Sequence, residues 1–342
     1  MEFTAGGRLE VRVTPADVGK RVSVRQLTGA GPGAEKFTDT VGVLTSWDGD
    51  VLLITRRTGE SVAVPAASLV AGKVVPAAPA RRRGPAATFA ELARAAARAW
   101  QPVESEPLGA WTLRAAAGPA PGGGPGRVGF TRRANSVLPL GDPGMELDAA
   151  LTRVRRWYGE RGLPAYAQVA TGAPDTQEPL RAELERRGWR PEVSAEVLTG
   201  ALAALGDRDA DVARVRLERT VGESWLRRYQ RTGTPGPHVR QVLAAGPSVW
   251  FATVPGEGGL PAAIGRCVTD GRWAGFMAVE VGPEHRRGGL ATTVMTALAR
   301  RALEEGASAA WLQVETDNEA ARALYAGLGF TAHHRYHHFR SP

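Results

Sequence analysis

The sequence contains little cysteine and little lysine. Cys267 is the only cysteine among 342 residues, so the chain can form no internal disulfide and no thiolate metal cluster. We expect it to be a small buried apolar residue. Lys20, Lys36 and Lys73 are the only lysines, so arginine supplies nearly all of the net charge of +8. This charge favours an anionic partner such as a nucleotide, although an arginine bias is weak evidence for nucleic-acid binding.

Long apolar runs are also absent. No stretch approaches the roughly 18 consecutive apolar residues of a membrane span, and residues 1–13 lack the basic-then-apolar order of a secretion signal. We therefore expect no membrane partner and a cytoplasmic location. Hydrophobic residues make up 43% and charged residues 23%, which is typical of globular proteins, and the length predicts two or three domains.

Residues 1–76 predict a small β-barrel. The turn dipeptides Asp48-Gly49 and Thr58-Gly59 separate the later strands, as tight hairpins require. So few residues bury one face best by curling into an SH3-like barrel. Its role is that of a structural appendage or of a docking or nucleic-acid-binding module. The predicted strands cover residues 18–27, 40–47, 51–56 and 61–65.

Residues 77–87 predict an exposed linker, because they are rich in proline and alanine. Arg81, Arg82 and Arg83 lie within this linker. They could bind phosphate, but a charge run in a linker is more typical of a solvated segment.

The rest of the chain predicts an α/β fold in which residues 88–200 and 201–342 are two copies of one unit. The segment AYAQVATGAPDTQEPLRAELERRGW aligns with AWLQVETDNEAARALYAGLGF, and strands and helices follow in the same order around both. The first copy predicts helices at 89–100, 147–161 and 179–187 and strands at 111–117, 133–140, 166–171 and 192–198. The second predicts strands at 276–281 and 310–314 and helices at 291–305 and 320–328.

The second copy contains an anion-binding loop. The strand at 276–281 leads through Arg286, Arg287, Gly288 and Gly289 into the helix. Glycines let the backbone approach a ligand closely, and the amide groups and dipole of a helix start favour negative charge. The arginines add full positive charge.

Two motifs of the second copy carry a resemblance to a known family. Over residues 205–342 the chain resembles the GNAT (GCN5-related N-acetyltransferase) superfamily. The resemblance implies that 201–342 is a catalytic domain that transfers an acetyl group from acetyl-CoA to a primary amine, which attacks directly in a ternary complex. The motifs are Arg286-x-x-Gly289-x-Ala291 and Asn318-x-x-Ala321-x-x-Leu324-Tyr325-x-x-x-Gly329-Phe330.

The resemblance also implies roles for single residues. Asn318 would contact the cofactor, and Tyr325 would protonate the departing thiolate. A phenol with a pKa near 10 is matched to that task. The alternative for Tyr325 is a helix residue packed on the core. The backbone of Val279, Glu280 and Val281 would pair with the pantetheine arm. The pyrophosphate would be held by Arg286, Arg287, Gly288, Gly289, Leu290, Ala291 and Thr292.

The general base is less clearly indicated. Gln313 stands where GNAT enzymes that acetylate protein N-termini carry a glutamate, and an amide cannot act as a base. Glu280 and Glu315 are the remaining carboxylates near the site, and either could deprotonate the ammonium directly or through water. We prefer Glu280, because it lies beside the splayed strand; the alternative is a strand residue that faces solvent.

The first copy is a degenerate GNAT fold. Its loop at 140–146 carries Asp142, Pro143 and Glu146 in place of the arginines, so we expect it not to bind CoA. It would instead form one wall of the acceptor site, with Arg132, Arg133 and Asn135 as candidate ligands.

The C-terminal strand holds His333, His334, His337 and His338, four of the six histidines. Strand alternation places His333 and His337 on one face and the other two on the opposite face. No thiolate or nearby carboxylate joins them, so we expect no metal. We expect this strand, with His333, to line the acceptor pocket.

The whole architecture resembles an actinobacterial group of N-acetylglutamate synthase-like enzymes. That resemblance implies a small-molecule amine as acceptor, such as the amino acid glutamate. Alternatives are a mycothiol-synthase-like enzyme, a protein-lysine acetyltransferase, and a non-catalytic CoA-sensing or nucleic-acid-binding module. The sequence indicates no oligomeric state.

Overall fold

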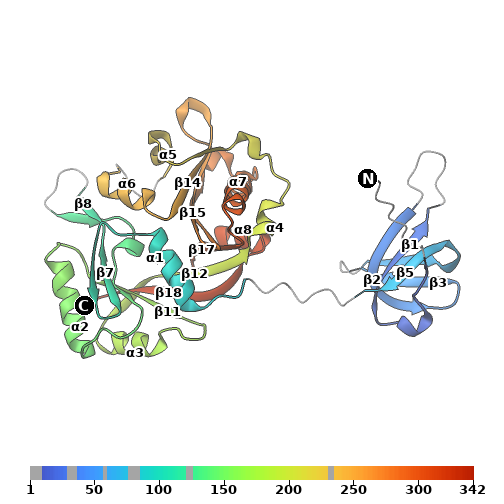
Figure 1. Cartoon of the computed structure of the whole chain (residues 1–342), viewed down its shortest axis with the longest axis horizontal. Coiled ribbons are helices and arrows are strands. Elements are labelled where there is room, and N and C mark those ends of the chain that lie inside the picture. The colour runs from blue at the N-terminus through green and yellow to red at the C-terminus, as the bar shows by residue number, and fades with distance from the viewer. Residues whose placement is uncertain (1–9, 29–36, 57–59, 76–84, 121–125, 230–234) are drawn as a thin grey trace. The chain divides into compact units, whose positions relative to one another are not determined.

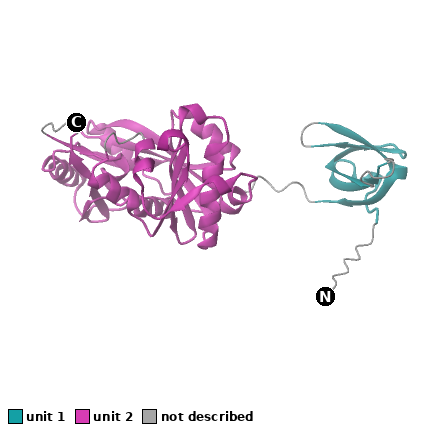
Figure 2. Ribbon diagram, turned by 90° about the horizontal axis from the view of Figure 1, so that it is seen from above, with its two compact units in different colours: residues 1–83 teal, residues 84–342 magenta. Residues whose placement is uncertain are grey.

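The structure is a computed structural model that describes residues 10–28, 37–56, 60–75, 85–120, 126–229 and 235–342. The chain forms two compact units, Met1–Arg83 and Gly84–Pro342 (Figure 2). The predicted linker at 77–87 spans this division. Arg81, Arg82 and Arg83 lie outside the described residues.

The N-terminal unit is a five-stranded antiparallel sheet with the strand order β4-β3-β2-β1-β5. The turn predicted at Asp48-Gly49 is present. The Oδ1 atom of Asp48 accepts hydrogen bonds from the backbone N–H groups of Asp50 (3.1 Å) and Val51 (2.9 Å), and Gly49 has a φ of 105°. The predicted turn at 58–59 lies outside the described residues. The strands are β1 (Arg21–Leu27), β2 (Phe37–Trp47), β3 (Val51–Thr55), β4 (Ser61–Pro65) and β5 (Leu69–Val74).

The C-terminal unit is built on an eight-stranded sheet with the order β11-β18-β12-β17-β16-β15-β14-β13 (Figure 1). Only β16 and β17 pair in parallel; the other neighbours are antiparallel. The strands are β11 (Tyr166–Thr171), β12 (Arg190–Ala201), β13 (Arg216–Glu218), β14 (Ser248–Val254), β15 (Ala263–Asp270), β16 (Trp273–Val281), β17 (Ala309–Glu315) and β18 (Thr331–Arg340).

The strands of the two predicted copies interleave in this sheet. The predicted order is present in both: β11, α3 (Glu178–Arg186) and β12 in the first, and β17, α8 (Glu319–Gly327) and β18 in the second. However, β18 pairs with β11 and β12, and β12 pairs with β17. The two halves therefore share one sheet inside one compact unit. The predicted boundary between the two copies, at residue 200, falls inside β12. It stays a prediction about the sequence repeat.

Helices cover both faces of the sheet, as the alternation along β15 shows. Ile264 and Val268 join the core formed with α1 (Phe89–Ala99), α5 (Glu223–Arg228) and α6 (Pro237–Ala244). Ala263 and Cys267 join the core formed with α4 (Leu202–Gly206) and α7 (Leu290–Glu304). Burial raises the pKa of the Cys267 thiol to about 12, so this residue is a small buried apolar group, as predicted.

The first half adds a smaller sheet with the order β10-β7-β6. The strand predicted at 133–140 is wrong for most of its length. A 3-10 turn at Arg132–Ala134 and the two-residue β10 replace it, because the Asn135 side chain binds the backbone of Ala116, Phe130 and Thr131 and bends the chain. The elements are β6 (Glu104–Leu108), β7 (Trp111–Ala115), β8 (Ala117–Pro119), β9 (Arg127–Gly129), β10 (Leu138–Pro139) and α2 (Leu147–Gly159).

Arg266 of β15 joins the ends of two helices inside the core. Its side chain is fully buried, and its guanidinium donates to the carbonyl oxygens of Leu243 (2.6 Å), Ala99 (3.0 Å) and Ala245 (2.7 Å). Among the described residues, no carboxylate forms an ion pair with Arg266. Burial lowers the pKa of Arg266 to about 10, so the group remains charged at neutral pH. This cation satisfies the C-terminal carbonyls of α1 and α6.

We expect Arg266→Met to lower the free energy of unfolding by about 3 kcal/mol or more, because several buried carbonyl groups lose their donor at about 1 kcal/mol or more each. Urea unfolding followed by tryptophan fluorescence measures the change. Arg155→Met, at an exposed position of α2, is the control and should stay within about 0.5 kcal/mol of the wild type. Equal stability of the two variants would contradict the role of Arg266.

Candidate functional site

The site begins where two parallel strands separate. β16 and β17 pair from Trp273 with Ala309 to Phe276 with Leu312, and the pairing ends there. Beyond this point β16 carries an irregularity in its pairing with β15, and Ala278 has a φ of 52°, which is strained for a residue other than glycine. Among the described residues, the last residues of β16 therefore have no strand partner on the side that faces away from β15.

A large cleft, here called the outer cleft, opens at this separation. Its volume is about 720 Å³, which lies within the range of ligand sites. The end of β16, the loop before α7, the start of α7 and one side of α8 line it. Its lining includes the predicted residues Val279, Glu280, Val281, Arg286, Arg287, Gly289, Leu290, Ala291, Thr292, Asn318 and Tyr325.

The loop before α7 has the geometry of an anion site. Gly289 is the N-cap of this 15-residue helix in a left-handed conformation (φ 77°), and in the described part of the chain no side chain caps the first amide groups. Arg287 also has a positive φ of 61°. Arg286 and Arg287 are exposed and form no ion pair with a carboxylate among the described residues. Free amide groups, the helix dipole and two cations therefore converge on one end of the outer cleft.

An ion pair anchors the same loop to the helix layer. Arg228 of α5 is almost fully buried; it donates to the carbonyl oxygen of Pro261 (2.6 Å) and to a carboxylate oxygen of Glu284 (3.0 Å). A hydrogen bond from its own backbone N–H, together with the Arg228 guanidinium, holds the pKa of Glu284 below its usual value. The charge of Arg228 is therefore balanced by Glu284. The charges of Arg286 and Arg287 have no such carboxylate partner among the described residues.

On the opposite wall, α8 carries Asn318 and Tyr325. The Asn318 side chain accepts a hydrogen bond from the backbone of Ala321 (3.1 Å) and thereby caps the helix. Both residues line the outer cleft and also the cavity behind it. Tyr325 thus lies at the junction of two cavities, with its ring also packed against the core beside Phe330.

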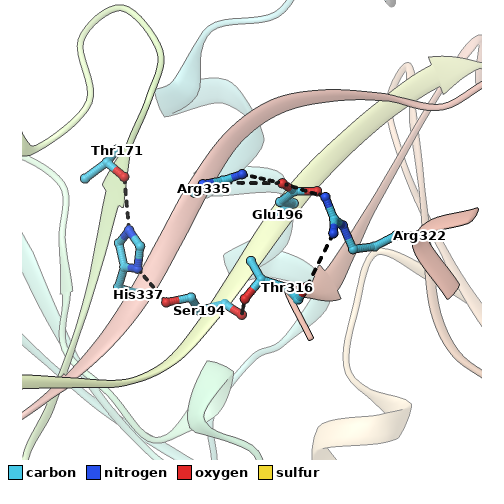
Figure 3. A network of polar contacts seen from close by, with 7 residues as sticks. All are labelled: Thr171, Ser194, Glu196, Thr316, Arg322, Arg335 and His337. Atoms are coloured by element: carbon cyan, nitrogen blue, oxygen red, sulfur yellow. Dashed lines mark hydrogen bonds and ion pairs between the residues drawn. The ribbon is translucent and has the colours of Figure 1, made fainter. Parts of the chain in front are cut away.

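A network from the first half holds α8 in place (Figure 3). Glu196 of β12 is only 6% exposed and accepts from Arg322 of α8 (3.1 Å) and from Arg335 of β18 (3.0 Å). Beside it, the backbone N–H of Thr316 donates to the carbonyl of Ser194 (3.0 Å). Arg322 lies one helical turn before Tyr325. A strand of the first half therefore positions the helix that carries the predicted acid.

Two smaller cavities lie behind the outer cleft. The inner pocket, of about 100 Å³, shares Val279, Glu280, Asn318, Ala321 and Tyr325 with the outer cleft. The far pocket, of about 140 Å³, shares Arg133, Tyr229 and Glu315 with the inner pocket. Shared linings place the three cavities in series, from the cationic loop to the junction of the two halves.

The predicted acceptor residues separate into two groups. Arg132 and Arg133 line the far pocket, and Arg132 pairs with Glu192 at 2.8 Å. Asn135 and His333 do not line it. Asn135 is buried against the backbone of its own loop, and His333 contacts the carbonyl of Ala87 (2.9 Å). Asn135 supports the pocket wall and does not face a ligand.

Trp100, Tyr229 and His338 line the inner or far pocket, and sequence reasoning did not single them out. Both ring nitrogens of His338 and the Nε1 of Trp100 are buried without a hydrogen-bond partner among the described residues. Burial, with the nearby arginines, lowers the pKa of His338 well below its usual value, so its imidazole is neutral. The histidine-rich strand was the one signal that pointed to this wall, but it favoured His333.

Backbone strain is concentrated along the three cavities. The described residues other than glycine with a positive φ are Thr131, Asp175, Ala278 and Arg287. Thr131 lines the far pocket, Ala278 the inner pocket and Arg287 the outer cleft. Such conformations cost about 1–3 kcal/mol each and are enriched at functional sites. The distribution therefore favours one continuous site.

Among the described residues, no group of three or more His, Cys, Asp or Glu side chains is placed to hold a metal ion. Within the same part of the chain, no helix is long and apolar enough to cross a membrane.

Comparison with known families and proteins identifies the relatives of the chain. The family described as "Probable histone acetyltransferase Rv0428c C-terminal" matches residues 86–339, and "Rv0428c N-terminal Sm-like domain" matches residues 16–73. The chain is 30% identical over 326 residues to "Probable histone acetyltransferase Rv0428c" of Mycobacterium tuberculosis (strain ATCC 25618 / H37Rv), with 93% of each chain covered. The chain belongs to the Rv0428c family. Its N-terminal unit is accordingly a small Sm-like β domain.

A second relative and two solved structures agree with this assignment. The chain is 25% identical over 262 residues to "Uncharacterized N-acetyltransferase YobR" of Bacillus subtilis (strain 168), covering 72% of this chain and 96% of that protein. A GCN5-related N-acetyltransferase from Kribbella flavida has a TM-score of 0.52 at 17% identity and covers 74% of this chain and 95% of its own. A tandem GNAT protein from the clavulanic acid biosynthesis pathway has a TM-score of 0.50 at 15% identity, covering 77% and 90%. This Rv0428c-family chain has the GNAT fold and is an acyltransferase.

We expect this Rv0428c-family protein to bind one acetyl-CoA per chain. The loop of the first half carries Asp142 and Pro143, and Asp148 lies in the first turn of α2, so negative charge replaces the cations at that helix start. Titration calorimetry measures the stoichiometry. Two equivalent sites per chain would contradict this expectation.

Gly289→Val should weaken CoA binding by about tenfold or more, because a β-branched residue is strained by about 1–2 kcal/mol in the left-handed conformation of the helix cap. Gly288→Ala is the matched control. An added Cβ at Gly288 meets nothing closer than the His285 carbonyl oxygen at 3.4 Å, so its affinity should stay near the wild-type value. Calorimetry with CoA compares the two variants, and a thermal melt verifies folding. Equal affinities would remove the helix cap from the binding argument.

Proposed function

We propose that this protein transfers an acetyl group from acetyl-CoA to the primary amine of a small molecule, by direct attack in a ternary complex. The observation that carries the proposal is the series of cavities. At the outer end of the cleft lie Arg286 and Arg287, which pair with no carboxylate among the described residues. The cleft leads to a pocket lined by two carboxylates, Glu280 and Glu315, with Tyr325 at the junction. A polyanionic donor and a cationic acceptor would meet at that junction.

The outer cleft supports the binding of the donor. Arg286, Arg287 and the first amide groups of α7 would hold the pyrophosphate, as their charge and geometry favour. The backbone of Val279 to Val281, which has no strand partner on the β17 side, would pair with the pantetheine arm. This arrangement would direct the thioester toward the inner pocket.

The transfer needs one base and one acid. An amine with a pKa near 10 must lose a proton before its nitrogen attacks the thioester carbonyl. As the C–N bond forms and the C–S bond breaks, the thiolate takes a proton from the Tyr325 hydroxyl, and the second proton lost from the nitrogen restores the phenol. Glu280 is our preferred base because it lines both the outer cleft and the inner pocket, whereas Glu315 lines the inner and far pockets. Gln313 also lines the inner pocket, and its amide cannot take the proton.

A protein lysine is the second candidate acceptor. The observation that favours it is the name of the Mycobacterium tuberculosis relative, a probable histone acetyltransferase that is 30% identical. A lysine side chain presents the same primary amine to the inner pocket. Incubation with acetyl-CoA and either small amines or lysine-containing peptides, followed by mass spectrometry, separates the two acceptors.

We also propose the finer architecture expected from the sequence. The N-terminal unit would be an SH3-like barrel, and the C-terminal unit a tandem of a degenerate and an intact GNAT half. The support is the curled strand order β4-β3-β2-β1-β5 in one unit and the recurring element order in the other. A cytoplasmic location and membership of the N-acetylglutamate synthase-like group remain predictions of the sequence.

Tyr325→Phe should lower kcat by about 100-fold to 10,000-fold, because it removes the proton donor while the ring still packs against Phe330 and the core. The affinity for acetyl-CoA should change little. Stopped assays that follow CoA release measure kcat, and calorimetry measures the affinity.

The control is Tyr158→Phe, which removes a buried hydroxyl that binds the backbone of Arg114 and lines none of the three cavities, so kcat should stay near its wild-type value. The pH profile adds a second readout. If the phenol is the acid, the high-pH limb of the wild-type rate should disappear in Tyr325→Phe. The same limb and the same rate in both proteins would make Tyr325 structural.

A further inference from the structure

We propose that the acceptor is a compact amino acid whose carboxylate is bound by Arg133 in the far pocket while its amine lies in the inner pocket. This inference rests on the proposed function and names the class of its acceptor. It follows from the arrangement of charges along the three cavities.

The arginines that line the cavities differ in their partners. Arg228 pairs with Glu284, and Arg132 pairs with Glu192. Arg286, Arg287 and Arg133 pair with no carboxylate among the described residues. The first two lie at the outer end, where the donor phosphates are expected, and Arg133 lies at the other end of the series. Arg133 should therefore bind a second anion, for the same reason that the outer pair should bind the phosphates.

Arg133 is held in a fixed position. Its Nε donates to the hydroxyl of Tyr336 (2.8 Å), and its guanidinium carbon lies 5.8 Å from the Trp100 ring and 5.9 Å from the Tyr336 ring. No acceptor for its Nη groups is found within the described part of the chain. An arginine fixed through Nε between two rings keeps those donors for a planar carboxylate.

The loop that carries Arg133 is held in a single strained conformation. Thr131 is strained (φ 53°), and the Asn135 amide fixes the loop by donating to the carbonyl oxygens of Phe130 (2.7 Å) and Thr131 (3.1 Å). Strain that surrounding contacts maintain is typical of binding sites. The degenerate half has thus lost a cofactor loop but retains an ordered ligand wall.

Charges of opposite sign meet across the inner pocket. Glu280 and Glu315 line it together with Arg133. An ammonium beside the carboxylates and a carboxylate beside the guanidinium match this pattern, whereas an alkylamine or a diamine leaves Arg133 without an anion. A dipolar acceptor is therefore the best fit.

The size of the cavities favours a free amino acid over a peptide. The inner and far pockets measure about 100 Å³ and about 140 Å³, and His338, which lines the far pocket, is only 2% exposed. Its neutral imidazole can donate one hydrogen bond and accept another. A small polar end suits a short acceptor with a second polar group.

Matched acceptors test the proposal on the full-length protein with acetyl-CoA. Glycine, β-alanine and γ-aminobutyrate are each compared with the alkylamine of the same chain length, and putrescine serves as the diamine. We expect at least one amino acid to exceed its alkylamine in kcat/KM by about tenfold or more, as a charge-assisted contact provides. In Arg133→Met that ratio should fall to about one, and Arg133→Lys should retain part of it.

Arg155→Met, on the exposed side of α2, is the control and should keep the wild-type ratio. Alkylamines that match every amino acid, or a ratio that Arg133→Met leaves unchanged, would overturn the proposal. So would efficient acetylation of a lysine peptide that is insensitive to Arg133→Met.

A binding measurement separates this proposal from the proposed function. Calorimetry titrates the three amino acids into protein saturated with CoA, which requires no turnover. The proposal expects at least one to bind, and to bind about tenfold or more weakly to Arg133→Met. Binding without CoA release would overturn the proposed function alone. CoA release with amines but no loss of binding in Arg133→Met would overturn the carboxylate site alone.

Discussion

The interleaving of strands between the two halves is the constraint on which the rest of the C-terminal unit depends. Because β18 lies between β11 and β12, and β12 pairs with β17, neither half has a complete sheet without the other. The Glu196 network crosses the same seam, from β12 to α8 and β18. The far pocket also lies there, with Arg133 from one half and Glu315 from the other. The first half therefore serves as a scaffold for the second.

Arginine serves two distinct purposes in this chain. Arg114 and Arg266 are buried and donate to backbone carbonyls, and although burial lowers the pKa of each to about 10, both stay charged at neutral pH and hold chain segments together. Arg286, Arg287 and Arg133 line cavities without a carboxylate partner among the described residues. The role of each arginine depends on the groups that it contacts in the folded chain. The number of arginines in the sequence therefore could not distinguish the structural arginines from those that face a ligand.

Local signals predicted much of the fold and one side of the site. The glycines and arginines before α7, the start of that helix and the positions of Asn318 and Tyr325 depend on contacts close in sequence. The interleaved pairing, the burial of His338 and the place of Trp100 beside Arg133 depend on contacts between distant segments. Alternation along β18 did not place His333 correctly, because the pairing with β12 shifts between Ala332 and His334, and His333 contacts the His334 ring and the Ala87 carbonyl on the same side. The strand expected at 133–140 failed because the Asn135 side chain competes for the backbone.

The position of β18 has a consequence for biosynthesis. This strand is translated after every other strand of the sheet, yet it occupies a place between two strands of the first half. Until it emerges from the ribosome, β11 and β12 present unpaired edges, and such edges invite association with other nascent chains. The first half should therefore depend on chaperones or on delayed collapse during synthesis. A translational stall before β18 would leave an aggregation-prone intermediate instead of a folded half-enzyme.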